Sequence, residues 1–338
     1  ENYVGNGAYK LANHIINEKI EFERNPLYWN DKETVINSAT FLAIENPSTD
    51  VARYRAGDLD MTNYGLPPEQ FAKLQKELPG EVYITRTLAT YSYELNNKKA
   101  PFDNVNIRKA LNLSLDRNVI TDKVLGQGQT PTYVFTPTYI EEGHLIQQPA
   151  YSKEPMAQRN EEAIKLLEEA GYSKANPLKF TILYNTNENH KKVAIAAASM
   201  WKANTKGLID VKLENQEWKT YIDSRRAGRY DAARAGWNAD YNQATTFGNY
   251  FLSNSSNNTA KYANPEYDKA IAESYVATDA EGRAKAYAKA EEILAKDFGI
   301  VPIFNYVNPR LVKPYVKGYS GKDPQDHIYL RNLYIIKH

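Results

Sequence analysis

Cysteine is missing from this sequence, and methionine and histidine are rare. The 338 residues include no Cys, 3 Met and 5 His. The absence of cysteine excludes disulfide bonds, thiolate zinc sites and cysteine nucleophiles, although it assigns no cellular compartment. The histidines are scattered and form neither an HExxH motif nor a paired metal spacing. The sequence therefore predicts no metal site and no cofactor.

Long apolar runs and an excess of one charge are also missing. No apolar run approaches the about 18 residues that span a bilayer, and the first residues lack the basic start and apolar core of a signal peptide. Lys and Arg total 42 against 41 Asp and Glu, so the composition does not indicate a nucleic-acid or anionic-membrane partner. Nucleophile-elbow, P-loop and dinucleotide-binding motifs do not occur. We therefore predict a protein that is not an enzyme and has no catalytic residue.

The periodicity that is present predicts an α/β protein. A chain of this length exceeds one ordinary core, which favours two lobes. Two expected strands (19–25, 35–46) and two expected helices (51–59, 67–78) come first. A helix–strand alternation later in the chain predicts a mainly parallel sheet there, with helices at 159–171 and 190–205 and strands at 178–185 and 210–216.

Three further expectations concern single segments and rings. Residues 103–126 carry an apolar stripe that predicts one long helix ending at Gly126. Residues 127–157 contain four prolines and predict a long ordered loop, a feature that is usually functional. Trp29 and Trp201 are expected in the core.

The segment 225–241, RRAGRYDAARAGWNADY, is the best candidate for a binding site. Its alanines and glycine at 232–236 would let another backbone approach closely. Arg234, Trp237 and Asp240 are costly to bury unless something pairs with them. A ligand with its own backbone, a positive end and a negative end would pair with all three, and a peptide is such a ligand.

Several motifs resemble one protein family, the solute-binding proteins of peptide ABC transporters (family 5), and within it the oligopeptide-binding members of Gram-negative bacteria. These motifs cover the whole chain and include NGAYKL (6–11), FERNPLYW (22–29), TDVARYRAGDLDMTN (49–63), KAPFDNVNIRKALNLSLDR (99–117), RNEEAIKLLEEAGY (159–172) and ARAGWNADYNQ (233–243).

The resemblance implies a periplasmic-binding-protein-like fold of type II, α/β, with two lobes, mixed sheets and a hinge. Residues 1–88 and 307–338 would form one lobe and 89–306 the second, larger lobe, while the family's small extra domain would be absent. It also implies a periplasmic monomer that binds short peptides and delivers them to an inner-membrane ABC permease, with no nucleic-acid partner. A separate N-terminal chain or fragment is expected to complete the fold, because the family has a substantial portion before the NGAY motif.

The resemblance also assigns roles to residues. Asp240 would accept the α-ammonium group of the ligand, and the main chain of Gly236, Trp237 and Asn238 would pair with the ligand as an added strand. Positively charged or polar groups would meet its carboxylate, and aromatic rings would line side-chain pockets. The former are Arg234, Arg225 and His190, and the latter are Trp218, Trp237 and Tyr93.

Other interpretations of these residues and of the function stay open. Asp240 could cap a helix or pair with an arginine, Arg225 could lie on the surface, and Trp218 could belong to the core. The rival functions are binding of a non-peptide solute such as haem or a metal chelate, a chaperone-like holder of unfolded segments, and a peptidase. The pair of Asp240 and Arg234 suits a zwitterion and counts against the first of these.

Familiar relatives have a pair of bonded cysteines where this chain has Ala89 and Asn238. If the alignment is correct, the Cα atoms of these two residues lie about 7 Å apart or less, within reach of a disulfide.

Overall fold

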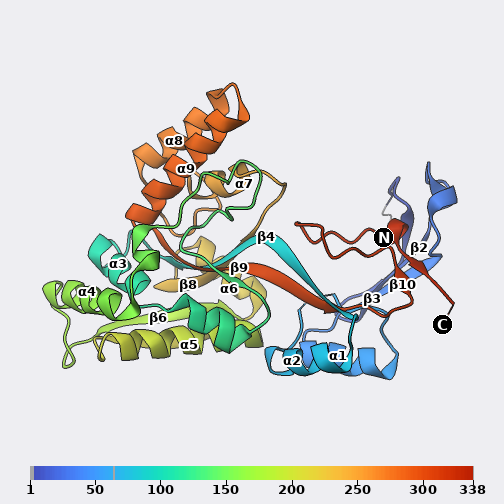
Figure 1. Cartoon of the computed structure of the whole chain (residues 1–338), viewed down its shortest axis with the longest axis horizontal. Helices are drawn as coiled ribbons and strands as arrows, with labels where there is room; N and C mark the ends of the chain where they lie inside the picture. The colour runs from blue at the N-terminus through green and yellow to red at the C-terminus, as the bar shows by residue number, and fades with distance from the viewer. Residues whose placement is uncertain (1–3, 64, 338) are drawn as a thin grey trace. The chain divides into compact units, whose positions relative to one another are not determined.

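The computed structural model describes residues 4–63 and 65–337, which form two compact units (Figure 1). One unit comprises residues 1–86 with 307–338, and the other comprises residues 87–306. The chain passes between them inside two strands, β4 (Val82–Leu95) and β9 (Ile300–Leu311). The first boundary differs by two residues from the one predicted, and the second coincides with it. The correspondence of each unit to a lobe of the family stays a prediction.

The first unit combines a small antiparallel sheet with two helices. The sheet contains β1 (Tyr9–Ile15), β2 (Lys19–Arg24) and β3 (Ser38–Leu42) in that order. Helix α1 (Pro47–Ala56) begins where the Asn46 side chain accepts a hydrogen bond from the Ser48 amide, and it ends at Gly57, whose φ is 89°. The remaining elements are α2 (Pro68–Glu77), the short strands β10 (Val316–Lys317) and β11 (Tyr334–Ile335), and the 3₁₀ turns η1 (Asp31–Glu33) and η5 (Leu330–Asn332).

The expected core position of Trp29 is wrong, whereas that of Trp201 is confirmed. Trp29 is 84% exposed because it lies in the turn that follows β2, outside the sheet. Trp201 is fully buried in the second unit, and its indole donates a hydrogen bond to the Leu111 carbonyl at 2.9 Å. A tryptophan in a turn has no neighbouring row of side chains to cover it, while one on an apolar helix stripe does.

The second unit is built on a six-stranded sheet with the order β5–β9–β4–β8–β6–β7. Its further strands are β5 (Thr130–Pro131), β6 (Leu178–Asn185), β7 (Ile209–Gln216) and β8 (Ala232–Asn238). Strand β6 runs parallel to β7 and β8, whereas β4 runs antiparallel to β8 and β5 antiparallel to β9. The mainly parallel prediction therefore holds only for the β6–β7–β8 part, and the predicted α/β class with mixed sheets is confirmed.

Helices cover both faces of this sheet. On one face lie α3 (Val105–Leu113), α4 (Met156–Glu169) and α5 (Glu188–Asn204), around a core that contains Trp201. On the other lie α7 (Thr245–Gly248), α8 (Pro265–Val276) and α9 (Ala280–Lys296), around a core that contains Phe247. Figure 1 shows α4 and α5 on the side of the sheet opposite to α8 and α9. Helix α6 (Trp218–Arg226) leads into β8, and η4 (Asn249–Phe251) follows α7.

The single long helix predicted for 103–126 is wrong. Helix α3 ends at Leu113, and a separate π-helical segment, η2 (Val119–Leu125), follows. Between them the guanidinium of Arg117 is fully buried and donates to the carbonyls of Thr132 and Pro302 at 3.0 and 2.7 Å. An arginine drawn into the core by carbonyls from distant segments turns the chain out of the helical path. The loop predicted at 127–157 is irregular apart from β5, η3 (Ala150–Lys153) and its last two residues, with which α4 begins.

Candidate ligand-binding site

The candidate residues on β8 are divided between the two faces of the sheet. In the antiparallel register with β4, Arg234 lies opposite Tyr93 and Gly236 opposite Tyr91. Successive side chains of a strand point to opposite faces, so Arg234 and Gly236 share one face with these tyrosines, and Trp237 belongs to the other. The segment that suggested a single binding cluster therefore places its side chains in two different environments, one on each face of the sheet.

One edge of β8 is open along the candidate segment. Strand β4 pairs with β8 over its whole length, whereas β6 pairs with it only at Ala232 and Ala233. From Ala235 to Asn238 the described residues provide no strand partner on that second side. An edge of this kind presents main-chain N–H and C=O groups that an extended chain can bind.

Arg234 is held in place on the face that it shares with Gly236. Its Nη2 donates to the Tyr306 hydroxyl at 2.5 Å, and its guanidinium lies 5.2 Å from the centre of the Tyr91 ring. A Cβ atom on Gly236 would come within 2.9 Å of Arg234 Nη2 and 3.0 Å of the Tyr306 hydroxyl. The glycine therefore leaves room for the guanidinium. This is a second reason for a small residue at position 236, besides the close approach of a ligand backbone.

His190 joins Arg234 at the same tyrosine. It lies in the first turn of α5, where its amide donates to the Asn187 side chain at 3.1 Å, and its buried ring lies 5.6 Å from that of Tyr91. Burial, with a smaller contribution from the Arg234 cation, holds the pKa of the imidazole well below its usual value. Two of the three groups predicted to meet a ligand carboxylate are thus brought together, one charged and one neutral.

Arg225, the third predicted group, lies apart from them in a buried ion pair. Its Nη2 lies 2.9 Å from Glu94 Oε2, and the two side chains are 10% and 1% exposed. The same nitrogen donates to the hydroxyls of Tyr250 and Thr259 at 3.2 and 2.9 Å. Burial lowers the pKa of Arg225, but the Glu94 carboxylate together with Tyr221 and Tyr250 outweighs this effect and raises that pKa well above its usual value. The surface position left open for Arg225 is wrong, and its charge is compensated internally.

The three aromatic candidates have three different environments. Tyr93 has no exposed surface and packs at 5.9 Å on Trp201, so the expectation that it lines a pocket is wrong. It points toward the helix layer that contains Trp201. Trp218 is 54% exposed and stacks on Tyr221, which excludes the core position left open for it. Trp237 is partly buried, and its ring contacts that of Tyr250 at 4.8 Å.

Asp240 follows the end of β8 and is exposed. The expectation of an enclosed carboxylate is therefore wrong for the described residues, in which β8 ends at Asn238, two residues before Asp240. The Asp240 amide donates to the Thr246 hydroxyl at 3.1 Å, and that hydroxyl lies 3.4 Å from the Asp240 carboxylate. Sequence reasoning missed Thr246 and Tyr306, because each approaches its partner only through the fold.

The predicted proximity of Ala89 and Asn238 is confirmed. The two residues are directly opposite each other in the β4–β8 register. Opposite Cα atoms of antiparallel strands are about 4.5–5.5 Å apart, well inside the limit for a disulfide. Asn238 is exposed at this end of the strand, next to the open edge.

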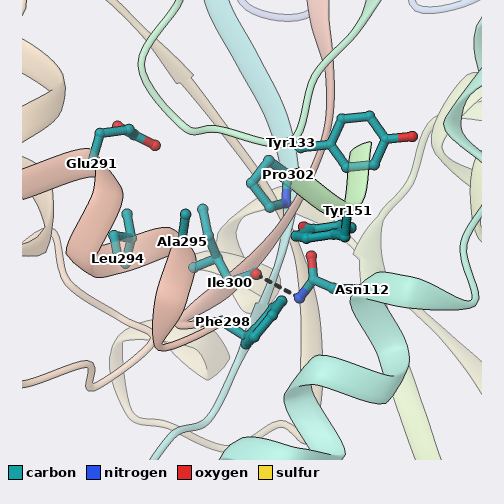
Figure 2. A pocket seen from close by; sticks show the side chains of 9 residues that line it. All are labelled: Asn112, Tyr133, Tyr151, Glu291, Leu294, Ala295, Phe298, Ile300 and Pro302. Atoms are coloured by element: carbon teal, nitrogen blue, oxygen red, sulfur yellow. Dashed lines mark hydrogen bonds between the residues drawn. The ribbon is translucent and has the colours of Figure 1, made fainter. Parts of the chain in front are cut away.

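A small cavity in the second unit is not part of this site. Its space for the centre of a water molecule is ≈ 10 Å³, about enough for one water. The cavity is lined by Asn112, Tyr133, Tyr151, Glu291, Leu294, Ala295, Phe298, Ile300 and Pro302 (Figure 2), none of them a predicted site residue. Across residues 4–63 and 65–337, no group of three or more His, Asp or Glu side chains is arranged to hold a metal ion. No helix in those ranges is sufficiently long and apolar for a bilayer.

A mixed α/β unit with an open strand edge, an arginine beside it and an exposed carboxylate at its end has the features of a ligand-binding protein. Comparison with known proteins agrees with this class. The family model of the bacterial extracellular solute-binding proteins, family 5 (middle part), matches residues 1–259. The chain therefore belongs to family 5 of the bacterial extracellular solute-binding proteins, as the motifs predicted.

Individual relatives are highly similar over the whole chain. The periplasmic oligopeptide-binding protein OppA of Haemophilus influenzae is 97% identical over 338 residues, which are 100% of this chain and 62% of that protein. OppA of Salmonella typhimurium is 54% identical over 337 residues, again 100% of this chain and 62% of the relative. The crystal structure of the Haemophilus influenzae OppA complex with RPPGFSPFR is 96% identical, has a TM-score of 0.94, and covers 99% of this chain and 65% of that one. The chain thus spans less than two thirds of the length of these relatives.

Proposed function

We propose that this protein binds short peptides as the solute-binding component of an ABC transporter. The open edge of β8 from Ala235 to Asn238 is the observation on which the proposal depends. It offers main-chain bonds to an extended ligand of any sequence, with a carboxylate near one end and a cation near the other. The names of the two relatives described above, both oligopeptide-binding proteins, favour a peptide over haem, a metal chelate or an unfolded segment.

In this proposal Asp240 binds the ligand's α-ammonium group, and Arg234 with His190 binds its carboxylate. An ion pair as exposed as one at Asp240 contributes roughly 0–1 kcal/mol. Shielding from water strengthens such a pair, and a peptide bound along β8 would itself exclude water from the carboxylate that it covers. Trp218, Trp237 and the main chain of Gly236 and Asn238 complete the contacts.

The site supports transport better than catalysis. Binding through main-chain groups and chain ends tolerates many side chains, which suits a carrier that delivers peptides to a permease. We therefore propose a periplasmic location, an inner-membrane ABC permease as the partner, and no catalytic activity. We also propose that the protein is a monomer.

Calorimetry with trialanine and N-acetyl-trialanine tests the proposal. The wild-type protein should bind trialanine at least about 10-fold more tightly, because acetylation removes the charge that Asp240 recognises and a charged hydrogen bond is worth about 1.5–3 kcal/mol. Asp240→Asn should bind both peptides with similar affinity. Equal binding of the two peptides by the wild-type protein would contradict the role of Asp240, and hydrolysis of bound trialanine would contradict a carrier.

A further inference from the structure

Thr246 lies between two of the proposed ligand-binding residues. It is 4% exposed in the short helix α7, six residues beyond Asp240 in the chain. Its Oγ1 accepts from the Asp240 amide at 3.1 Å and lies 3.3 Å from the Trp237 indole nitrogen. Its carbonyl accepts from the same indole nitrogen at 3.0 Å. One buried threonine therefore contacts the main chain of one candidate and the side chain of another.

The hydrogen-bond capacity of a hydroxyl fixes where its single proton points. A threonine hydroxyl has two acceptor lone pairs and one donor. Both lone pairs face N–H donors, one from Asp240 and one from Trp237. The proton is left for the third neighbour, Asp240 Oδ2, at 3.4 Å. Because two donors polarise the hydroxyl, its own donation to the carboxylate is strengthened.

The surrounding loop is held by other bonds, so Thr246 is not needed to fix its main chain. On the N-terminal side of Asp240, the Ala239 amide donates to the Leu88 carbonyl at 2.8 Å. On the C-terminal side of Asp240, the Ala244 amide donates to the Glu141 carbonyl at 3.0 Å, and the Asn242 side chain accepts from the Glu141 amide at 3.2 Å. What the Thr246 hydroxyl adds is the direction of the Asp240 side chain.

We propose that Thr246 is a positioning residue, which orients the Asp240 carboxylate and the Trp237 indole for the ligand's amino terminus. The Thr246 hydroxyl favours one rotamer of the Asp240 carboxylate, and a rotamer that is fixed before binding lowers the entropy lost when the ammonium group binds. The inference rests on the proposed function, and it concerns a residue that does not itself touch the peptide.

The test compares the affinities of Thr246→Val and Thr246→Ser for trialanine and N-acetyl-trialanine. Valine keeps the shape and removes the hydroxyl, and serine keeps the hydroxyl. We expect Thr246→Val to lower the affinity for trialanine by about 10-fold, as for loss of one hydrogen bond to a charged group. The affinity for N-acetyl-trialanine should stay nearly unchanged. Thr246→Ser should retain the wild-type preference. If the role of Thr246 were merely structural, Thr246→Val would bind both peptides more weakly by the same factor.

Thr245→Val is the matched control. This neighbouring threonine is also buried, but its hydroxyl donates to the Gln243 side chain at 2.8 Å rather than to Asp240. The control should keep the preference for the free amine. If Thr246→Val does not fold, Thr246→Ala provides the same loss of hydroxyl without placing a methyl group among polar atoms.

The outcomes distinguish a failure of this inference from a failure of the proposed function. If Asp240→Asn abolishes the preference for the free amine while Thr246→Val and Thr246→Ala keep it, the positioning role is wrong and the proposed function stands. If the wild-type protein shows no preference, the role of Asp240 fails, and the inference about Thr246 falls with it.

Discussion

The buried pair of Glu94 and Arg225 allows a decisive test, because the sequence assigned Arg225 to the ligand and the structure gives it an internal partner. The perturbation is Glu94→Gln, which removes one charge and keeps the size of the side chain. Glu94 accepts from the Tyr250 hydroxyl at 2.6 Å and from the Thr259 hydroxyl, in addition to Arg225. We expect the variant to lose stability rather than ligand contacts.

The magnitude follows from the geometry of the pair. Two unit charges 2.9 Å apart attract by about 6 kcal/mol at an effective dielectric constant of about 20. Glutamine keeps one acceptor oxygen for the hydroxyls but places an NH₂ group among donors. Breaking a buried pair by removing one partner costs about 3–5 kcal/mol, because the remaining charge is uncompensated. We therefore expect the free energy of unfolding to fall by about 3–5 kcal/mol.

Urea unfolding followed by far-UV circular dichroism measures this change. For a unit of about this size the loss corresponds to a Tm lowered by roughly 6–20 °C. The double variant Glu94→Gln with Arg225→Met should be more stable than Glu94→Gln alone, because no buried charge is left without a partner. With the single variant Arg225→Met and the wild-type protein, these two variants complete a double-mutant cycle that gives the coupling energy of the pair.

Peptide binding supplies the refuting result. Per folded molecule, Arg225→Met should bind trialanine as the wild-type protein does, while its stability falls. A loss of stability below about 1 kcal/mol in Glu94→Gln, together with a 10-fold weaker affinity in Arg225→Met, would refute the reasoning and return Arg225 to the ligand site.

Three further predictions concern residues near the open edge of β8. Cysteines introduced together as Ala89→Cys and Asn238→Cys should form a disulfide on oxidation and raise the free energy of unfolding by roughly 2–4 kcal/mol; two titratable thiols after oxidation would contradict the register. Gly236→Ala should displace the guanidinium of Arg234 at little cost in stability and lower affinity for trialanine about 10-fold, but not for its C-terminal amide, as calorimetry can show; unchanged affinity for both would show that the glycine is not needed there. The imidazole of His190 stays neutral when buried, whereas the unfolded chain binds a proton below about pH 6.5. Stability should therefore fall by up to about 2 kcal/mol between pH 7.5 and 5, and His190→Gln should reduce this fall in urea unfolding at the two pH values; an equal fall in both proteins would contradict the buried neutral state.

Local sequence pattern and family motifs were sufficient to predict the helices and strands near the site. The strand at 178–185 and the helix and strand after it occur within two residues of their predicted bounds, since their periodicity reflects which side of each element is covered. The opposition of Ala89 and Asn238 followed from the resemblance, because paired cysteines in relatives require neighbouring strands.

The helix predicted at 103–126 and the core position of Trp29 failed for one physical reason. Both were inferred from short-range pattern, yet each depends on what distant segments provide. Carbonyls of Thr132 and Pro302 draw Arg117 inward and interrupt the helix, whereas no segment among the described residues covers Trp29. Sequence spacing contains no information about such partners.

The sequence by itself determined the family, the α/β class, and the strand that carries Arg234, Gly236 and Trp237, because these depend on residue order and local periodicity. Only the tertiary structure decided how the charges are used. Pairing with β4 places Arg234 beside His190 on one face of the sheet and leaves Arg225 to Glu94 in a separate network. A buried charge takes its function from the partner that the fold brings to it, and that partner can come from any part of the chain.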